Sequence, residues 1–337
     1  MPGDVNHDGY DDVIVGAPDY PTGQRYGIAL LYLGTASGLD NSPAWSVQGS
    51  RYGSEFSYSV ASAGDVNNDG FDDVIIGAHR WEDPSINEGA AFLYLGSKTG
   101  LSTTHSWTKQ GNQTSAYFGK SLASAGDINK DGYDDVLVGA PIYTNGQSNE
   151  GRAYLYYGMS TGLNTSPAWT AEVNVAYANL GSSLSSAGDV NGDTYTDVIV
   201  GADHYTNDGG TGTETYEGAA FVYYGSPSGL STSDNWHYES NQSYANCGSA
   251  VSGIRDVNHD GYDDVMVGCP GWNGINDYEG VVLVFYGSAS RIAVIPKLGL
   301  YLWASGRQSG WIDRAPGRCE RGRNSGFRRD GPVLDQS

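Results

Sequence analysis

The sequence predicts an all-β fold, an incomplete β-propeller made of four-stranded antiparallel blades. The prediction rests on a repeat of 61 to 67 residues, on short strand-like segments within each repeat, and on composition. With 49 Gly and 25 Tyr in 337 residues, the chain suits short strands joined by tight turns. One four-stranded sheet cannot bury both of its faces, so each repeat needs neighbours. A parallel β-helix is the structural rival, but its repeats are usually much shorter.

The repeat is marked by a polar motif and by a tryptophan, and both keep the same spacing. The motif Asp-x-Asn-x-Asp recurs at intervals of 61, 62, 62 and 67 residues, beginning at Asp4, Asp65, Asp127, Asp189 and Asp256. The tryptophans are Trp45, Trp107, Trp169 and Trp236. The predicted units start near residues 1, 52, 114, 176 and 244. Residues 1–290 therefore hold about 4.5 blades.

The third unit shows how four strands fit into one repeat. Phe118–Ala125 alternates large and small residues, which suits a first strand. The polar segment Asp127–Asp135 follows as a loop, and the apolar run Val136–Val138 is the second strand. Ala153–Tyr157 is the third strand, and Trp169 marks the fourth.

The polar loop has the donors of a calcium site. Its nine residues read Asp-x-Asn-x-Asp-Gly-Tyr/Phe-x-Asp in most copies. Ca²⁺ takes six to eight oxygen ligands, which positions 1, 3, 5 and 9 can supply from side chains and position 7 from its carbonyl. Glycine at position 6 allows the backbone to wrap the ion. The sequence thus predicts about five calcium ions, one per loop. The predicted ligands are Asp4, Asn6, Asp8, Tyr10, Asp12, Asp65, Asn67, Asp69, Phe71, Asp73, Asp127, Asn129, Asp131, Tyr133, Asp135, Asp189, Asn191, Asp193, Tyr195, Asp197, Asp256, Asn258, Asp260, Tyr262 and Asp264.

The fourth loop tests which aspartate matters. Position 8 is Thr196 there, whereas position 9 remains Asp197, so position 9 is the predicted ligand. Thr194 replaces the loop glycine, which predicts backbone strain and the weakest of the five sites. Two alternatives are Asx-turn hairpins that need no metal and an EF-hand. Nineteen carboxylates in five loops argue against the first, and the flanking strands and the lack of Glu at position 12 argue against the second.

The flanks of the loop identify a family. Phe118-Gly119 and Gly139-Ala140-Pro141 surround the third loop as in FG-GAP repeats, and the chain resembles the seven-bladed calcium-binding propeller of integrin α subunits and their bacterial relatives. Cys247-Gly248 and Gly268-Cys269-Pro270 depart from this pattern. The resemblance implies a ring of seven blades and a secreted or cell-surface location. A loop in every unit is more similar to the prokaryotic secreted members than to a true integrin.

The expected function is binding or cell adhesion, with a protein or glycan ligand at a propeller face. Tyrosines of the loops offer amphipathic contact surface, although each can equally pack between blades. These tyrosines are Tyr143, Tyr177, Tyr205 and Tyr244. No His-Glu-x-x-His or Gly-x-Ser-x-Gly motif occurs, so we do not expect an enzyme. The alternatives are the accessory propeller of a secreted polysaccharide lyase or phospholipase, and a surface-layer scaffold.

Charge and hydropathy exclude two kinds of partner. Residues 1–290 hold 35 Asp/Glu and 9 Lys/Arg, a net charge of −26, which argues against nucleic-acid binding. No apolar stretch approaches the roughly 18 to 20 residues that a transmembrane helix needs. Met1 is followed at once by a repeat motif, so the N-terminus is expected to be truncated, with a signal peptide and further domains missing.

The three cysteines give no disulfide framework, because their number is odd. Cys247 and Cys269 occupy positions where other units have Phe or Leu and Ala. We expect them to be small buried apolar residues rather than disulfide partners.

The basic tail, residues 291–337, is interpreted as the same repeat in a shifted reading frame. Its 9 Lys/Arg and 4 Asp/Glu give a net charge of +5. Read one base later, Arg318–Arg323 can encode Asp-Val-Asn-Gly-Asp-Gly, and position 318 lies 62 residues after Asp256. The alternative is a disordered tail or a polyanion-binding patch.

Sequencing the coding DNA tests the frameshift. We expect the frame shifted by one base to continue the repeat and to encode a sixth calcium loop. Early stop codons in that frame, or no loop at all, would refute the interpretation.

Overall fold

The computed structural model describes residues 3–206, 215–274, 277–290, 292, 296 and 298–301, the last four by backbone alone. These residues form antiparallel sheets that follow one another along the chain, which confirms the all-β fold of propeller blades. None of the described residues belongs to a helix that is long and apolar enough to span a bilayer.

Five sheets make up the body, and each is ordered by chain sequence. The first contains β1 (Val13–Ala17), β2 (Ile28–Tyr32) and β3 (Trp45–Gln48). The second contains β4 (Ser59–Gly64), β5 (Asp73–Ala78), β6 (Ala90–Tyr94) and β7 (Trp107–Gln110). The third contains β8 (Ser121–Gly126), β9 (Asp135–Ala140), β10 (Arg152–Tyr156) and β13 (Trp169–Ala171), with a small ribbon of β11 (Gly158–Met159) and β12 (Gly162–Leu163) beside it. The fourth contains β14 (Leu180–Gly188), β15 (Asp197–Ala202), β16 (Ala219–Tyr223) and β17 (Trp236–Glu239). The fifth contains β18 (Ala250–Arg255), β19 (Asp264–Cys269), β20 (Val281–Phe285) and β21 (Leu298–Tyr301).

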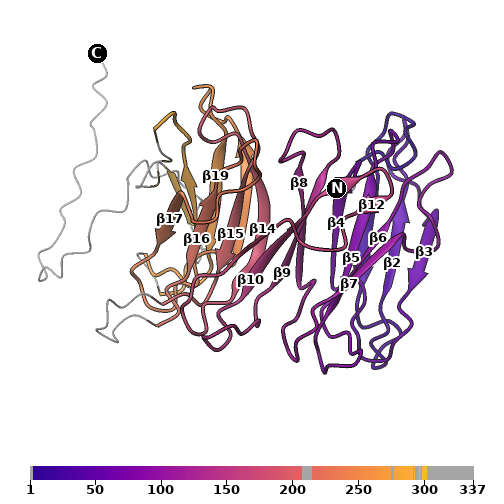
Figure 1. Ribbon diagram of the computed structural model, residues 1–337, viewed down its shortest axis with the longest axis horizontal. Helices are drawn as coiled ribbons and strands as arrows, with labels where there is room; N and C mark the ends of the chain where they lie inside the picture. The colour runs from indigo at the N-terminus through magenta and orange to yellow at the C-terminus, as the bar shows by residue number, and fades with distance from the viewer. Residues whose placement is uncertain are drawn as a thin grey trace, which may run out of the picture.

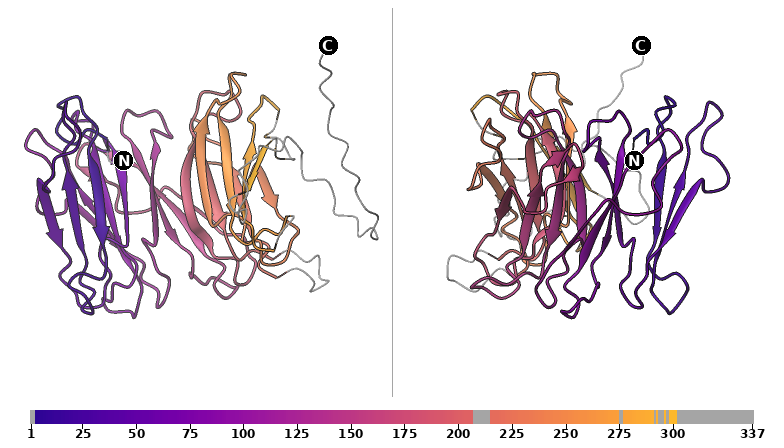
Figure 2. Two further views of the ribbon diagram at one scale, coloured as in Figure 1. Left: turned by 180° about the vertical axis from the view of Figure 1, so that it is seen from behind. Right: turned by 45° about the vertical axis from the view of Figure 1, so that its right-hand side comes forward.

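The sheets stack in sequence order, with the first and the fifth at opposite ends of the row (Figures 1 and 2). The first strands of successive four-stranded sheets lie side by side, since β8 packs against both β4 and β14, and β14 packs against β18. Because adjacent strands are antiparallel, the loops after first strands lie at one end of the stack. The loops after second and fourth strands lie at the other end.

The core lies between the sheets. One apolar cluster fills each gap between neighbours, and the second strand of a blade contributes to the clusters on both of its sides. In β9, for example, Val136, Leu137 and Val138 are completely buried, with Leu137 facing the fourth sheet and its two neighbours facing the second. Burying each such side chain stabilises the fold by about 1.5–3 kcal/mol. This explains why the second strand is an uninterrupted apolar run.

The strands predicted for the third unit are confirmed at β9, β10 and β13. The first strand was predicted from Phe118, but β8 begins at Ser121. The backbone of Tyr117 and of Gly119 is left-handed, with φ of 56° and 79°, which keeps these residues out of the ladder. Phe118 instead forms an isolated bridge to Gly89 of the second sheet, where a side chain at residue 89 would collide with its carbonyl.

The recurring tryptophan ties the first blade to the second, the second to the third and the third to the fourth. The indole Nε1 of Trp107 donates to the carbonyl of Asn164 at 3.1 Å, and that of Trp169 to Ser231 at 2.8 Å. Trp45 makes the equivalent bond at 2.9 Å. The ring itself packs on the core, so this residue serves both burial and inter-blade hydrogen bonding.

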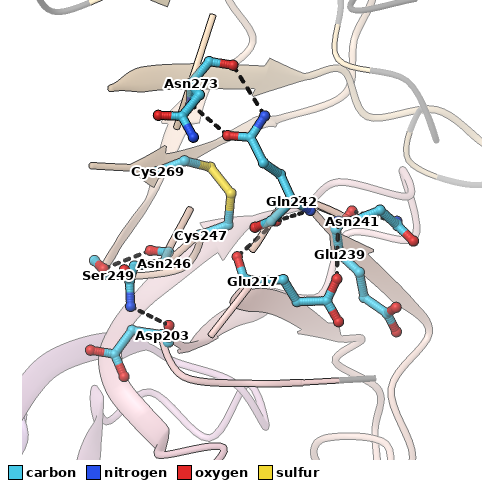
Figure 3. The surroundings of a disulfide bond; sticks show 11 residues. Asp203, Glu217, Glu239, Asn241, Gln242, Asn246, Cys247, Ser249, Cys269 and Asn273 are labelled. Atoms are coloured by element: carbon cyan, nitrogen blue, oxygen red, sulfur yellow. Dashed lines mark hydrogen bonds between the residues drawn. A yellow bond between two sulfur atoms is a disulfide. The ribbon is translucent and has the colours of Figure 1, made fainter. Parts of the chain in front are cut away.

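The prediction that Cys247 and Cys269 are unpaired is wrong, because they form a disulfide (Figure 3). Both residues are completely buried, as expected. Their place in the blade brings them together: the matching residues of the fourth sheet, Leu180 and Ala202, face each other directly across two strands. Strand register brings Cys247 and Cys269 together, although the odd number of cysteines in the sequence argued against a disulfide.

The segment after residue 290 lies mostly outside the described residues, including the predicted sixth loop. Within it, β21 extends the fifth sheet, and Val284 pairs with Leu298 as Val222 pairs with Trp236 in the fourth. The frameshift stays a prediction.

Removing the disulfide tests its contribution. Cys247→Ala with Cys269→Ala should lower the free energy of unfolding by about 3 kcal/mol, because the crosslink closes a short loop in the unfolded chain. Denaturant unfolding measures this. The control is a reducing agent, which should destabilise the natural chain and leave the double variant unchanged. Equal stability of the two proteins without reductant would contradict the expectation.

Candidate functional site

The five polar loops lie at one end of the stack. Each precedes the second strand of a blade, as residues 127–135 connect β8 to β9. The loops are numbered here from first to fifth by their starting residues, Asp4, Asp65, Asp127, Asp189 and Asp256.

The side chains at positions 1, 3 and 5 of each loop lie together, and those at positions 1 and 3 both accept the backbone amide of position 5. In the third loop the amide of Asp131 lies 3.1 Å from Asp127 Oδ1 and 2.9 Å from Asn129 Oδ1. Asn129 Nδ2 lies 2.9 Å from Asp131 Oδ2. The amide of Gly132 donates to Asp127 Oδ2 at 2.8 Å, and the amide of Tyr133 donates to Asp131 Oδ1 at 3.1 Å. The same set recurs in the other four loops.

The aspartate at position 9 lies behind this group, at the start of the second strand. Asp135 is completely buried, and its carboxylate accepts the amides of Ile128 and Gly158, both at 2.9 Å. It thereby fastens the loop to Gly158, which lies just beyond the end of the third strand. Among the described residues, no three Asp, Glu, His or Cys side chains converge on one metal position. Coordination by position 9, and by the carbonyl of position 7, stays a prediction.

Burial makes the position-9 carboxylates electrostatically unfavourable. It raises the pKa of Asp73, Asp135 and Asp197 to about 7, against the opposing effect of two amides each, and nearby aspartates of the same loop raise it further. The pKa of Asp12 and of Asp264 is raised for the same reasons. A divalent cation among the carboxylates would favour their charged form. The side chains at positions 1, 3 and 5 offer carboxylate or amide oxygens as metal ligands, which fits Ca²⁺.

The strain expected at Thr194 is present. Its φ is 75°, in the left-handed region where the other loops have glycines with φ from 88° to 92°. Position 4 is left-handed as well, which sequence reasoning missed. Its φ lies between 55° and 79° in the five loops. The residues at position 4 are His7, Asn68, Lys130, Gly192 and His259.

Position 8 has a role that sequence reasoning also missed. Asp134 Oδ2 accepts the amide of Asp65, the first residue of the preceding loop, at 3.0 Å. The only signal in the sequence is the aspartate that four of the five loops share at this position. Its partner lies 69 residues away, so only the arrangement of the blades reveals it.

Comparisons with known proteins agree with this architecture. A family model described as FG-GAP repeat matches residues 1–31, 56–85, 118–156, 180–223 and 248–285. Integrin alpha-5 of Xenopus laevis is 31% identical over 211 residues, which are 59% of this chain and 19% of that protein. Integrin alpha-4 of the same organism is 37% identical over 141 residues, which are 41% of this chain and 13% of that protein. This chain thus spans less than a fifth of the length of these relatives.

Among solved structures, the exotype rhamnogalacturonan lyase YesX aligns with 78% of this chain and 53% of its own, at 13% identity and a TM-score of 0.39. A likeness at this level carries no argument. The family match covers more than half of the residues, and each matched segment contains one of the five polar loops. The chain belongs to the FG-GAP repeat family.

Proposed function

We propose that the chain is a calcium-stabilised, extracellular binding or cell-adhesion module without catalytic activity. Its ligand is a protein or a glycan that binds the face opposite the calcium loops. The observation that carries this proposal is a group of exposed tyrosines on that face, in the loops of the fourth and fifth blades. They are Tyr177, Tyr216, Tyr244 and Tyr278, here called the tyrosine face.

The tyrosine face presents aromatic surface to solvent. The exposed fractions are 55% for Tyr177, 38% for Tyr216, 50% for Tyr244 and 68% for Tyr278. Tyr216 and Tyr244 form an edge-on ring pair with centroids 6.0 Å apart, and His204 contacts Tyr216 edge-on with centroids 4.7 Å apart. Tyrosine is enriched in protein interfaces because its ring is apolar and its hydroxyl can hydrogen-bond.

The backbone of these tyrosines is left-handed, as it is at the matching positions of the third unit, Ser115 (φ 61°) and Asn149 (φ 51°). All four are left-handed, with φ between 52° and 64°. Such a backbone destabilises a non-glycine residue by about 1–2 kcal/mol. Ser115 matches Tyr177 and Tyr244, and Asn149 matches Tyr216 and Tyr278, in the third unit. The left-handed conformation therefore belongs to the repeat, and in the fourth and fifth blades it is occupied by exposed aromatic rings that can contact a ligand.

The other two tyrosines singled out from the sequence are partly buried and pack against the core. Tyr143 lies against the cluster between the second and third sheets, with the Arg152 guanidinium 4.0 Å above its ring. Tyr205 lies against the next cluster, 5.5 Å from Phe221. Tyr143 and Tyr205 therefore stabilise the blades, while Tyr177 and Tyr244 remain available.

Calcium has a structural role in this proposal, because its loops are at the other end of the strands. Ions that bind only the folded chain stabilise it by mass action. Extracellular modules bind calcium at about 10⁻⁴–10⁻³ M, which matches conditions outside the cell. The disulfide supports the same location, since such bonds persist in oxidising compartments.

Asp131→Ala tests the calcium role. The variant should lose up to about 2.7 kcal/mol of stability at a calcium concentration one hundred times the dissociation constant, because one site no longer binds. In EDTA its stability should be close to that of the natural chain. Thermal unfolding in both conditions measures the effect, with Asp40→Ala, an exposed aspartate outside the loops, as control. An equal loss with calcium and with EDTA would argue against a metal role.

Substitution of the tyrosine face tests the binding role. Glycan and protein arrays, screened with and without calcium, should give a ligand for the full chain. The triple variant Tyr177→Ser, Tyr216→Asn and Tyr244→Ser should bind it about tenfold more weakly, because aromatic anchors dominate interfaces. Tyr52→Ser, an exposed tyrosine between the first two blades, should bind normally. Unchanged affinity in the triple variant would refute the site, and turnover of polysaccharides or phospholipids would favour the enzyme alternative.

A further inference from the structure

The eighth loop residue joins one calcium loop to the next by two hydrogen bonds. Asp134 Oδ2 accepts the amide of Asp65 at 3.0 Å, and the amide of Asp134 donates to the carbonyl of Asp65 at 3.1 Å. This reciprocal pair is called the clamp here. It fixes the backbone on both sides of Asp65, whose side chain is the first predicted ligand of the second loop.

The clamp recurs at two other junctions. Between the first and second loops, Asp72 accepts the amide of Asp4 at 2.8 Å and donates to its carbonyl at 3.3 Å. Between the fourth and fifth loops, Asp263 makes the same bonds to Asp189 at 2.8 and 3.0 Å. Each clamp links residues 68 to 74 positions apart, so it is a contact between blades.

The residue before each clamped loop is a glycine that makes room for the carboxylate. Gly64 has a φ of 74°, and a Cβ at this residue would lie 2.0 Å from Asp134 Oδ2. At Gly3 and Gly188 the corresponding distances to the clamp oxygens are 1.9 and 2.1 Å. Any other residue would push the carboxylate away. The clamp therefore depends on two positions of the repeat, the aspartate at position 8 of one loop and the glycine that precedes the neighbouring loop.

The junction between the third and fourth loops lacks the clamp. Thr196 stands at position 8 there, and no hydrogen bond between described residues joins it to Asp127. A Cβ on Gly126 would find Thr196 no nearer than 3.9 Å. These two loops touch instead through Lys130, whose Nζ donates to Thr194 Oγ1 at 2.6 Å. That contact is exposed, and it joins two side chains without fixing the backbone of a predicted calcium ligand.

We propose that Asp72, Asp134 and Asp263 couple calcium binding between neighbouring loops, so that the five loops act as a coupled group of three and a coupled pair. This inference rests on the proposed function, because it needs calcium in the loops. Asp134 lies between the seventh and ninth residues of its own loop, both predicted ligands. An ion that orders this stretch also orders the carboxylate that holds Asp65. The second loop then loses less conformational entropy when it binds calcium, so calcium at the third loop favours calcium binding at the second.

These aspartates act as positioning residues, and substitutions separate that role from charge. Asp134→Thr places at position 8 the residue that is found at the junction without a clamp. It should weaken calcium binding at the neighbouring loop about fivefold, although residue 134 is no ligand. Asp134→Asn removes the charge but keeps an oxygen that can accept the amide of Asp65. The calcium affinity of the second loop should therefore be close to that of the natural chain. Asp11→Thr makes the same change at the first loop, where Asp11 is exposed, and should have little effect.

Equilibrium dialysis of the full chain against calcium alone measures these effects. Asp131→Ala, which disables the third loop, should also weaken the second loop in the natural background, so that binding falls by more than one ion at intermediate calcium. In the Asp134→Thr background it should remove one ion only, as a double-mutant cycle shows. Thr196→Asp, for which Gly126 leaves room, should create the missing coupling and raise the affinity of the third loop.

The outcomes separate the coupling from the proposed function. A natural chain that retains no calcium overturns both. Calcium binding in the natural chain with identical affinities in Asp134→Thr and Thr196→Asp overturns the coupling and leaves the proposed function standing. Thermal unfolding in EDTA shows whether each variant folds. If Asp134→Thr does not fold, Thr196→Asp decides alone, and unchanged affinity at the third loop overturns the coupling.

Discussion

The packing of each sheet between two neighbours is the interaction on which the rest of the molecule depends. A single blade would leave both faces of its central strands in water, and the buried run from Val136 to Val138 is stable only with a sheet on either side. The resulting stack is rigid enough to hold unusual backbone at both of its ends. Left-handed residues such as Thr194 and Tyr177 persist because the strands that flank them cannot rearrange.

Periodicity made much of this structure predictable. The repeat, the strands of each unit and the polar loops follow from spacing and alternation, because these are local properties of the chain. What could not be predicted depends on strand register and on which blade lies alongside. The Cys247–Cys269 disulfide and the hydrogen bonds of Asp134 are of this kind. Tyr143 and Tyr177 are equally plausible surface residues in the sequence, and only the path of the backbone separates the half-buried ring of Tyr143 from the exposed ring of Tyr177.

The position-9 aspartates connect the chemistry of the loops to the core. Sequence reasoning treated Asp135 as a ligand, whereas the structure also gives it two amide partners, one in the loop and one just after the third strand. Burial raises its pKa to about 7, so a proton and a nearby cation would compete for this carboxylate near neutral pH. The loop and the blade are thus joined by the same group whose charge a bound ion would stabilise.

The four-stranded hairpin pattern of each blade has a consequence for how such proteins can diverge. The turns after first and third strands lie at one end of the blades, and those after second and fourth strands lie at the other, with the length of the strands between them. Residues that alter what the molecule recognises can therefore change without touching the residues that keep it folded. One end of such a scaffold can therefore vary in sequence while the other end stays unchanged.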